Sequence, residues 1–236
     1  MKNRSMFKRY CLFFVGLVCC SAGIAFITRA GLGTSPVSGL PFVISLITGI
    51  SMGTFTFLFN MLFLIMEAIL RKKFSVQQAL QIPITFFFSF CIDRFMSIIP
   101  TRYGGAWGPS FVYLVIGCVV MGLGISLEVM ADVIMLPAEA LVRAISQKTG
   151  IQFGNVKIGF DSTLTICAMI IALLAFHKLN GVREGTLINA LAVGNIVKVW
   201  KKLLEKPVAR LVALKQRESS DTVLSVFALR KRWKVR

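Results

Sequence analysis

The chain has 236 residues, of which 56% are hydrophobic and only 16% are charged, and its formal net charge is +17. A soluble domain carries about 25% charged residues, so this composition excludes an ordinary water-soluble fold. Several apolar stretches approach the roughly 20 residues that cross a bilayer as a helix, and none alternates as a membrane β-strand does, so we expect an all-α, polytopic membrane helix bundle.

The N-terminus, residues 1–9, is basic, and an apolar helix is expected over residues 10–28. A basic start followed by an apolar run resembles a signal peptide. However, no small-x-small cleavage site precedes a polar segment, and residues 112–130 repeat the same apolar stretch inside the chain. We therefore expect this helix to be a retained membrane span.

A break in the helical pattern follows the first span. Pro36 suits the first turn of a short helix that runs to about residue 48, and Thr34 or Ser35 can cap it. A helix of that length measures about 20 Å, which is too short to cross the roughly 30 Å hydrocarbon core comfortably. The residues that break the helical pattern around this helix are Gly31, Gly33, Pro36 and Gly49.

Full spans are expected at 52–70 and 76–98, and the second half of the chain repeats the plan. Its elements are a span at 110–129, a short helix from Pro137 that ends near Gly150, and spans at 153–176 and 185–203. We divide the chain into membrane units at 10–106 and 107–205, followed by a basic tail at 206–236.

The two units are similar in sequence. Residues 15–60 match the segment 101 residues later at 14 of 46 positions without a gap, and Gly16, Gly23 and Pro36 fall on Gly117, Gly124 and Pro137. The last span of each unit aligns only at an offset of 105. Many membrane carriers are duplicated units that share a binding site, so the repeat favours such a protein.

Two topologies fit this plan. If each short helix re-enters the membrane, each unit has three crossings and the second unit is inverted; if it crosses, the chain has eight spans and parallel units. Basic residues favour the cytoplasmic side, and the eight-span topology exports the cluster at 71–73. We therefore prefer six spans in a bacterial inner membrane, with inverted units and both termini cytoplasmic.

Polar residues at membrane depth are the candidate site residues, because such groups are costly there. Asn60 and Asp161 occupy equivalent positions, about 12 Å into their spans, and can bind a substrate or coupling ion. Alternatively, Asp161 forms an internal ion pair with Lys157, four residues earlier.

The short helices offer further candidates. Glu139 and Arg143 are spaced to form an ion pair that either faces solvent or lines a cavity. The helix starts at Thr34, Ser35 and Pro137 present free backbone N–H groups, and broken helices at matched positions of two repeats point to a transporter site.

The sequence shows no residue pattern for metal binding, catalysis or nucleic-acid binding. The six cysteines show no metal-ligand spacing, the single histidine stands alone, and no Ser/His set or carboxylate dyad is present, so we expect no metal, no cofactor and no enzyme. The basic residues flank spans instead of forming a face with stacking aromatics, so nucleic-acid binding is not expected.

Several short motifs resemble the YczE/YitT-like bacterial membrane proteins over about residues 10–203. They are Ala30–Pro36, Pro137–Glu139 with Thr149–Gly150, Gly154–Lys157 and Gly181–Thr186. The resemblance implies an inner-membrane protein and assigns no activity to it.

The leading hypothesis is a small secondary transporter or exporter, alone or as a homodimer, that moves an unidentified small solute or ion across the lipid bilayer. The alternative is a non-transporting membrane protein that stabilises or regulates a partner complex.

Overall fold

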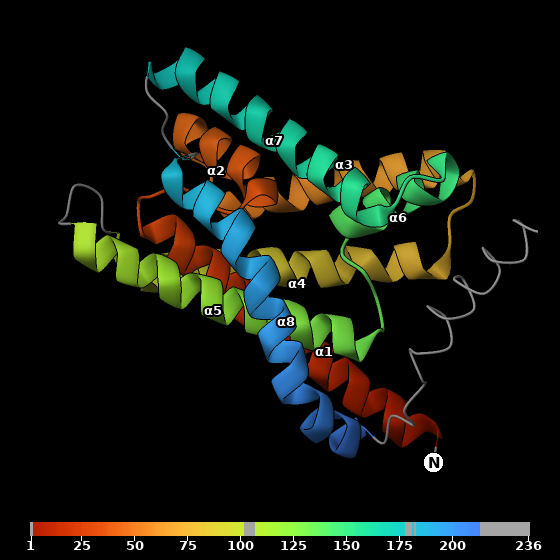
Figure 1. Ribbon diagram of the computed structural model, residues 1–236. Helices are drawn as coiled ribbons and strands as arrows, with labels where there is room; N and C mark the ends of the chain where they lie inside the picture. Colours follow the sequence, from red (N-terminus) through yellow and green to blue (C-terminus); the bar gives the residue numbers. More distant parts are fainter. Residues whose placement is uncertain (1, 102–106, 178–180, 182, 213–236) are drawn as a thin grey trace, which may run out of the picture.

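The computed structural model describes residues 2–101, 107–177, 181 and 183–212, and every regular element in these ranges is an α-helix, which confirms the all-α prediction (Figure 1). The helices are α1 (Lys2–Arg29), α2 (Pro36–Thr48), α3 (Met52–Arg71), α4 (Val76–Ile98), α5 (Trp107–Ala131), α6 (Pro137–Thr149), α7 (Phe153–Phe176) and α8 (Glu184–Val212). The last part of the basic tail, from residue 213, lies outside the described residues.

Five helices, α1, α3, α4, α5 and α7, are long and apolar enough to cross a membrane. The 13-residue helices α2 and α6 are shorter than a span, as the sequence predicts. The helix α8 has 29 residues, but its second half carries Lys198, Lys201 and Lys202, and it is not among the five. The span expected at 185–203 therefore stays a prediction.

The breaks around the short helices lie where the sequence places them. Gly31, Gly49 and Gly150 have φ angles of 74°, 74° and 73°, in the left-handed region that glycine adopts at little cost. Gly33, with φ 123°, is more constrained still, because an added Cβ would meet the hydroxyl of Thr186 at 2.5 Å. These glycines let the chain turn tightly before α2 and after each short helix.

The prediction that a side chain caps the start of α2 is wrong. Ser35 occupies the N-cap position, but its hydroxyl donates to Ser38 Oγ at 2.9 Å and makes no capping bond. The hydroxyl of Thr34 is also engaged, with that of Thr28 at 2.7 Å. Pro36 and Pro137 do open their helices, as predicted.

The centre of the molecule is the close antiparallel crossing of α1 and α5. An added Cβ on Gly16 would lie 2.9 Å from the carbonyl oxygen of Gly124, and one on Gly117 would lie 3.0 Å from that of Gly23. Small residues of this kind allow helix backbones in a membrane to approach closely. The crossing thus depends on glycines in both helices.

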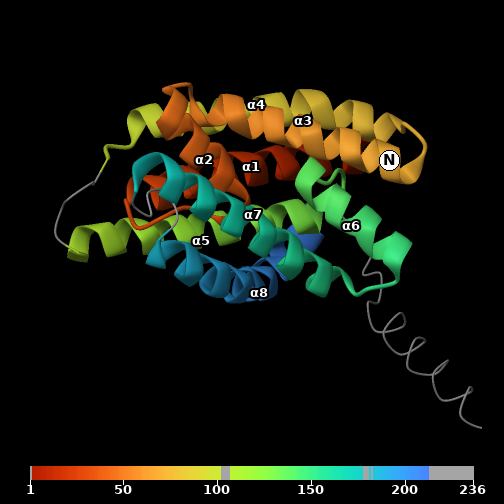
Figure 2. The same ribbon diagram turned by 90° about the horizontal axis from the view of Figure 1, so that it is seen from above.

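The other helices pack around this crossing, and each short helix packs against a long helix from the other half of the chain. The short helix α2 packs against α7, the short helix α6 packs against α3, and α4 and α8 pack on α1 and α5 respectively. Figure 2 shows α3 and α4 side by side. By contrast, α7 and α8 diverge from the end near their connection and are not packed along their length (Figure 1).

Hydrogen bonds hold the two breaks in place. The N–H of Thr34 donates to Thr186 Oγ1 at 3.2 Å, and the N–H of Gly185 donates to the carbonyl of Leu32 at 2.8 Å. On the second break, Gln81 Nε2 donates to the carbonyl of Met135 at 3.0 Å. Each break is therefore anchored by the last helix of the other half of the chain.

Replacing Thr186 with valine tests the first of these anchors. The substitution keeps the shape but leaves the buried N–H of Thr34 without its acceptor, which costs about 1–3 kcal/mol. We expect a lower midpoint of thermal unfolding for the purified protein in detergent. The control is Thr163→Val, because Thr163 is exposed and bonds only within its own helix. Equal midpoints for the two variants would contradict an anchoring role.

Candidate functional site

A cavity of about 930 Å³ lies between the short helices and the spans. All eight helices contribute to its walls, α4 through Phe88 alone, and most of the side chains that form it are apolar. Binding sites for small molecules usually have volumes of about 300–1,000 Å³ and mostly apolar walls with a few polar groups. The cavity therefore has the size and lining of a small-molecule site.

The cavity brings together most of the residues that the sequence singles out. Five of them line it: Ser35, Asn60, Glu139, Lys157 and Asp161. The sixth, Thr34, is buried next to it, where it bonds to Thr28 and Thr186 instead of facing the cavity. The seventh, Arg143, is absent from this lining and lies in a second cavity.

Asn60 and Asp161 face this cavity from α3 and α7. Asn60 is buried, and its Nδ2 donates to the carbonyl of Thr56 one turn earlier at 2.8 Å. Asp161 Oδ1 accepts from Lys157 Nζ at 2.9 Å, and both of these side chains remain about one quarter exposed, at 25% and 27%. The ion pair on α7 is thus formed, and it faces the cavity, so the structural and binding interpretations both stand.

The prediction of an ion pair between Glu139 and Arg143 is wrong. Among the described residues, ion pairs join Glu67 to Arg71 and Lys157 to Asp161, and none joins Glu139 to Arg143. Arg143 Nη1 instead points to the sulfur of Met135 at 3.6 Å. Glu139 turns into the cavity because it lies in the first turn of α6, which is packed inside the protein.

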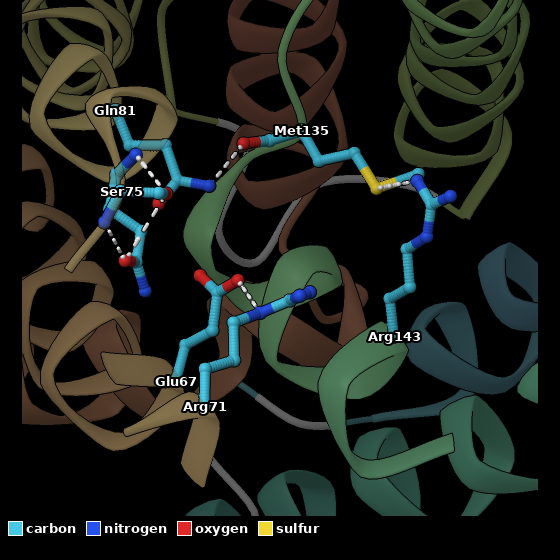
Figure 3. A network of polar contacts seen from close by, with 7 residues as sticks. Glu67, Arg71, Ser75, Gln81, Met135 and Arg143 are labelled. Atoms are coloured by element: carbon cyan, nitrogen blue, oxygen red, sulfur yellow. Dashed lines mark hydrogen bonds and ion pairs between the residues drawn. The ribbon is translucent and has the colours of Figure 1, made fainter. Parts of the chain in front are cut away.

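A second cavity, of about 810 Å³, lies next to the first and is more polar. Figure 3 shows the network that surrounds it, in which Glu67 accepts from Arg71 Nε at 2.7 Å. Gln81 and Arg143 approach Met135 from opposite sides in the same view. This cavity lies at the end of the bundle that carries Lys73, in the basic cluster which the sequence assigns to the cytoplasmic side.

Glu128 is the residue that the sequence analysis missed. It lines both cavities, and so do Glu139 and Ile125. Its Oε1 atom is buried and has no hydrogen-bond partner among the described residues. A signal was present, because Glu128 is the only charged residue of the span expected at 110–129.

The place of Glu128 is set by the helix crossing. A Cβ added to Gly16 would lie 2.9 Å from Glu128 Cγ, so the side chain passes over a surface that only glycine leaves open. The thiol of Cys20 lies on the same side of α1 and donates to the carbonyl of Met121 at 3.8 Å. The crossing of α1 and α5 thus forms part of the wall between the two cavities.

The site does not have the composition of a metal centre. Within the described ranges, no group of three or more His, Cys, Asp or Glu side chains is close enough to hold a metal ion. The arrangement instead combines apolar walls with a small number of carboxyl and amide groups, which suits an organic solute.

Comparison with known proteins places the chain in a family. It is 25% identical over 202 residues to "Uncharacterized protein YyaS" of Bacillus subtilis (strain 168), a match that covers 84% of this chain and 94% of that protein. No solved structure matches the chain. Residues 7–202, which include every residue that lines the cavity, match the family described as "Family of unknown function (DUF6198)", and the chain belongs to that family.

Proposed function

We propose that this polytopic membrane protein is a small secondary carrier, built from two inverted units that share one substrate cavity. The observation that carries the proposal is the lining of the 930 Å³ cavity by equivalent positions of both units. At the offset of 101, seven pairs contribute together: Cys20 and Met121, Ile24 and Ile125, Ser35 and Leu136, Val37 and Ala138, Ser38 and Glu139, Thr56 and Lys157, and Asn60 and Asp161. A site shared by two repeats is typical of secondary transporters.

The contacts between α1 and α5 support the inversion. Gly16 lies against Gly124, which is the equivalent of Gly23, and Gly23 lies against Gly117, which is the equivalent of Gly16. Reciprocal contacts of this kind are expected of two copies related by a two-fold axis. Because the two helices are antiparallel, such an axis lies in the membrane plane and inverts one unit.

The anchors of the two breaks support the same axis. Thr34 and Met135 are equivalent at the offset of 101, and Gln81 and Thr186 are equivalent at the offset of 105. Thr186 bonds to Thr34, and Gln81 bonds to Met135. The last helix of each unit therefore anchors the break of the other unit.

The contact between the last two helices differs between the units, as alternating access requires. We call this contact the seam; α3 and α4 form it in the first unit, and α7 and α8 form it in the second. Gly53 on α3 is packed against the carbonyl of Ser89 and the carboxyl of Asp93 on α4, and Asp93 accepts from the N–H of Gly53 at 2.7 Å. The equivalents Gly154 and Gly194 have no atom within 4 Å of an added Cβ among the described residues. The seam between α7 and α8 is thus open while that between α3 and α4 is closed.

The seam between α7 and α8 is the better candidate for movement. Lys198 stands at the position equivalent to Asp93, so this seam lacks the carboxylate that clamps the start of α3. We infer that α7 and α8 close and open around the solute, and that the protein acts in the bacterial inner membrane, as the YczE/YitT resemblance implies.

The test is ligand-induced thermal stabilisation of the purified protein. Panels of organic cations, organic anions and neutral solutes are screened against the wild type, Asp161→Asn, and Glu205→Gln as an exposed-carboxylate control. A carrier should gain several degrees from at least one solute class, and Asp161→Asn should reduce that gain while Glu205→Gln keeps it. If no class stabilises the wild type and one protein co-purifies with it, the carrier is contradicted in favour of a partner-binding role.

A further inference from the structure

The charges in the 930 Å³ cavity are not balanced. Three carboxyl groups line it, on Glu128, Glu139 and Asp161. Asp161 is neutralised by Lys157 at 2.9 Å, whereas no ion pair within 4.0 Å joins Glu128 or Glu139 to another residue of the described ranges. The paired residues therefore contribute little net charge, and the two glutamates determine which charge a solute should carry.

The fifth charged residue of the lining, Arg183, lies at another part of the cavity. Its Nη1 donates to the carbonyl of Gly31 at 3.3 Å, next to the start of α8 and the break before α2. Glu128 and Glu139 lie instead beside the second cavity, at the end of α5 and the start of α6. The guanidinium group is thus held at the loop, and the glutamates form a separate acidic part of the cavity.

Glu128 has the features of a ligand-binding group. Its Oε1 is buried without a hydrogen-bond partner among the described residues, and a buried acceptor that is left unpaired is destabilising, more so when it is charged. Its side chain is held over Gly16 by the helix crossing, beside the thiol of Cys20. A bound cation would supply the missing partner.

The apolar walls decide the kind of cation. The rings of Phe59, Phe63 and Phe88 line the same cavity, and aromatic faces attract organic cations while offering no ligand to a hydrated metal ion. No cluster of three metal-binding side chains exists in the described ranges. The combination of aromatic walls with two carboxyl groups that form no ion pair among the described residues fits a cation that has a large apolar body.

We propose that the shared cavity binds a lipophilic monovalent organic cation, with Glu128 and Glu139 as its charge partners at the wall between the two cavities. This inference rests on the proposed carrier function and names its substrate class. Because both glutamates also line the second cavity, a cation bound to them can pass between the cavities without leaving its counter-charges.

The probe is tetraphenylphosphonium, compared with the anion tetraphenylborate and with neutral triphenylphosphine oxide. Binding to the full-length protein in detergent is measured by isothermal titration. We expect the phosphonium to bind and the anion and the neutral compound to bind at least tenfold more weakly. Glu128→Gln and Glu139→Gln, which keep the shape of the side chain, should each weaken phosphonium binding at least tenfold.

The control variant is Glu205→Gln, because Glu205 is exposed and lines neither cavity. It should bind the phosphonium as the wild type does, and unchanged melting of the two cavity variants would show that they fold. Equal affinity for cation and anion, or undiminished cation binding in Glu128→Gln, would overturn the inference. If anions or neutral solutes bind and cations do not, the carrier stands and only its substrate class is wrong.

Discussion

Replacing Gly23 with alanine is expected to destabilise the protein strongly. The new Cβ would lie 2.6–2.7 Å from the backbone N and Cα of Met121, so one of the two helices at the central crossing must move. Overpacking of a tight interior costs about 1–3 kcal/mol and sometimes more, which outweighs the roughly 1 kcal/mol by which alanine exceeds glycine in helix propensity. The measurement is the midpoint of thermal unfolding in detergent.

The matched control is Gly159→Ala on α7. Gly159 also lies within an apolar span, but an added Cβ there meets no atom within 4 Å. Only the gain in helix propensity remains, so this variant should melt at the wild-type temperature or above it. If Gly23→Ala melts as high as Gly159→Ala, the glycine crossing does not hold α1 and α5 together.

The sequence carries most of the information on the helices and little on how they meet. The short helices begin at Pro36 and Pro137, as expected, because proline at the first helical position and a glycine after the last one are strong local signals. Candidate site residues such as Asn60 and Asp161 could be selected because a polar group in an apolar span is conspicuous.

The missed features depend on tertiary contacts. Glu128 looks like a residue near the end of a span until the crossing places it over Gly16 and between the two cavities. The spacing of Glu139 and Arg143 suggests an ion pair, but Glu139 also reaches the first cavity, whereas Arg143 lines only the second and donates to the sulfur of Met135. Local spacing does not determine which neighbour a side chain finds.

The second large effect is expected at the seam between α7 and α8. Gly154 and Gly194 are replaced by cysteines in a protein whose six native cysteines have been removed. A Cβ added at either position meets no atom of a neighbouring helix within 4 Å in the described structure, so both cysteines are accommodated without strain. A disulfide requires Cα atoms about 4.4–6.8 Å apart, so it forms only when the two helices close.

We expect an oxidant to cross-link this pair in membranes, and the solute that stabilises the protein to change the rate of cross-linking severalfold. The cross-linked protein should no longer bind tetraphenylphosphonium from solution, because the opening between α7 and α8 is shut. A reductant should restore binding. The control pair is Gly154→Cys with Gly108→Cys, two open positions on helices that do not pack against each other.

The same cross-linking experiment tests most directly whether two flipped halves move around one solute chamber. Rapid disulfide formation at positions 154 and 194, slow formation in the control pair, and reversible loss of solute entry would support a moving carrier. A pair that stays reduced under every condition, while the protein still binds its solute, would mean that the seam is permanently open and that the chain is not a carrier of this kind.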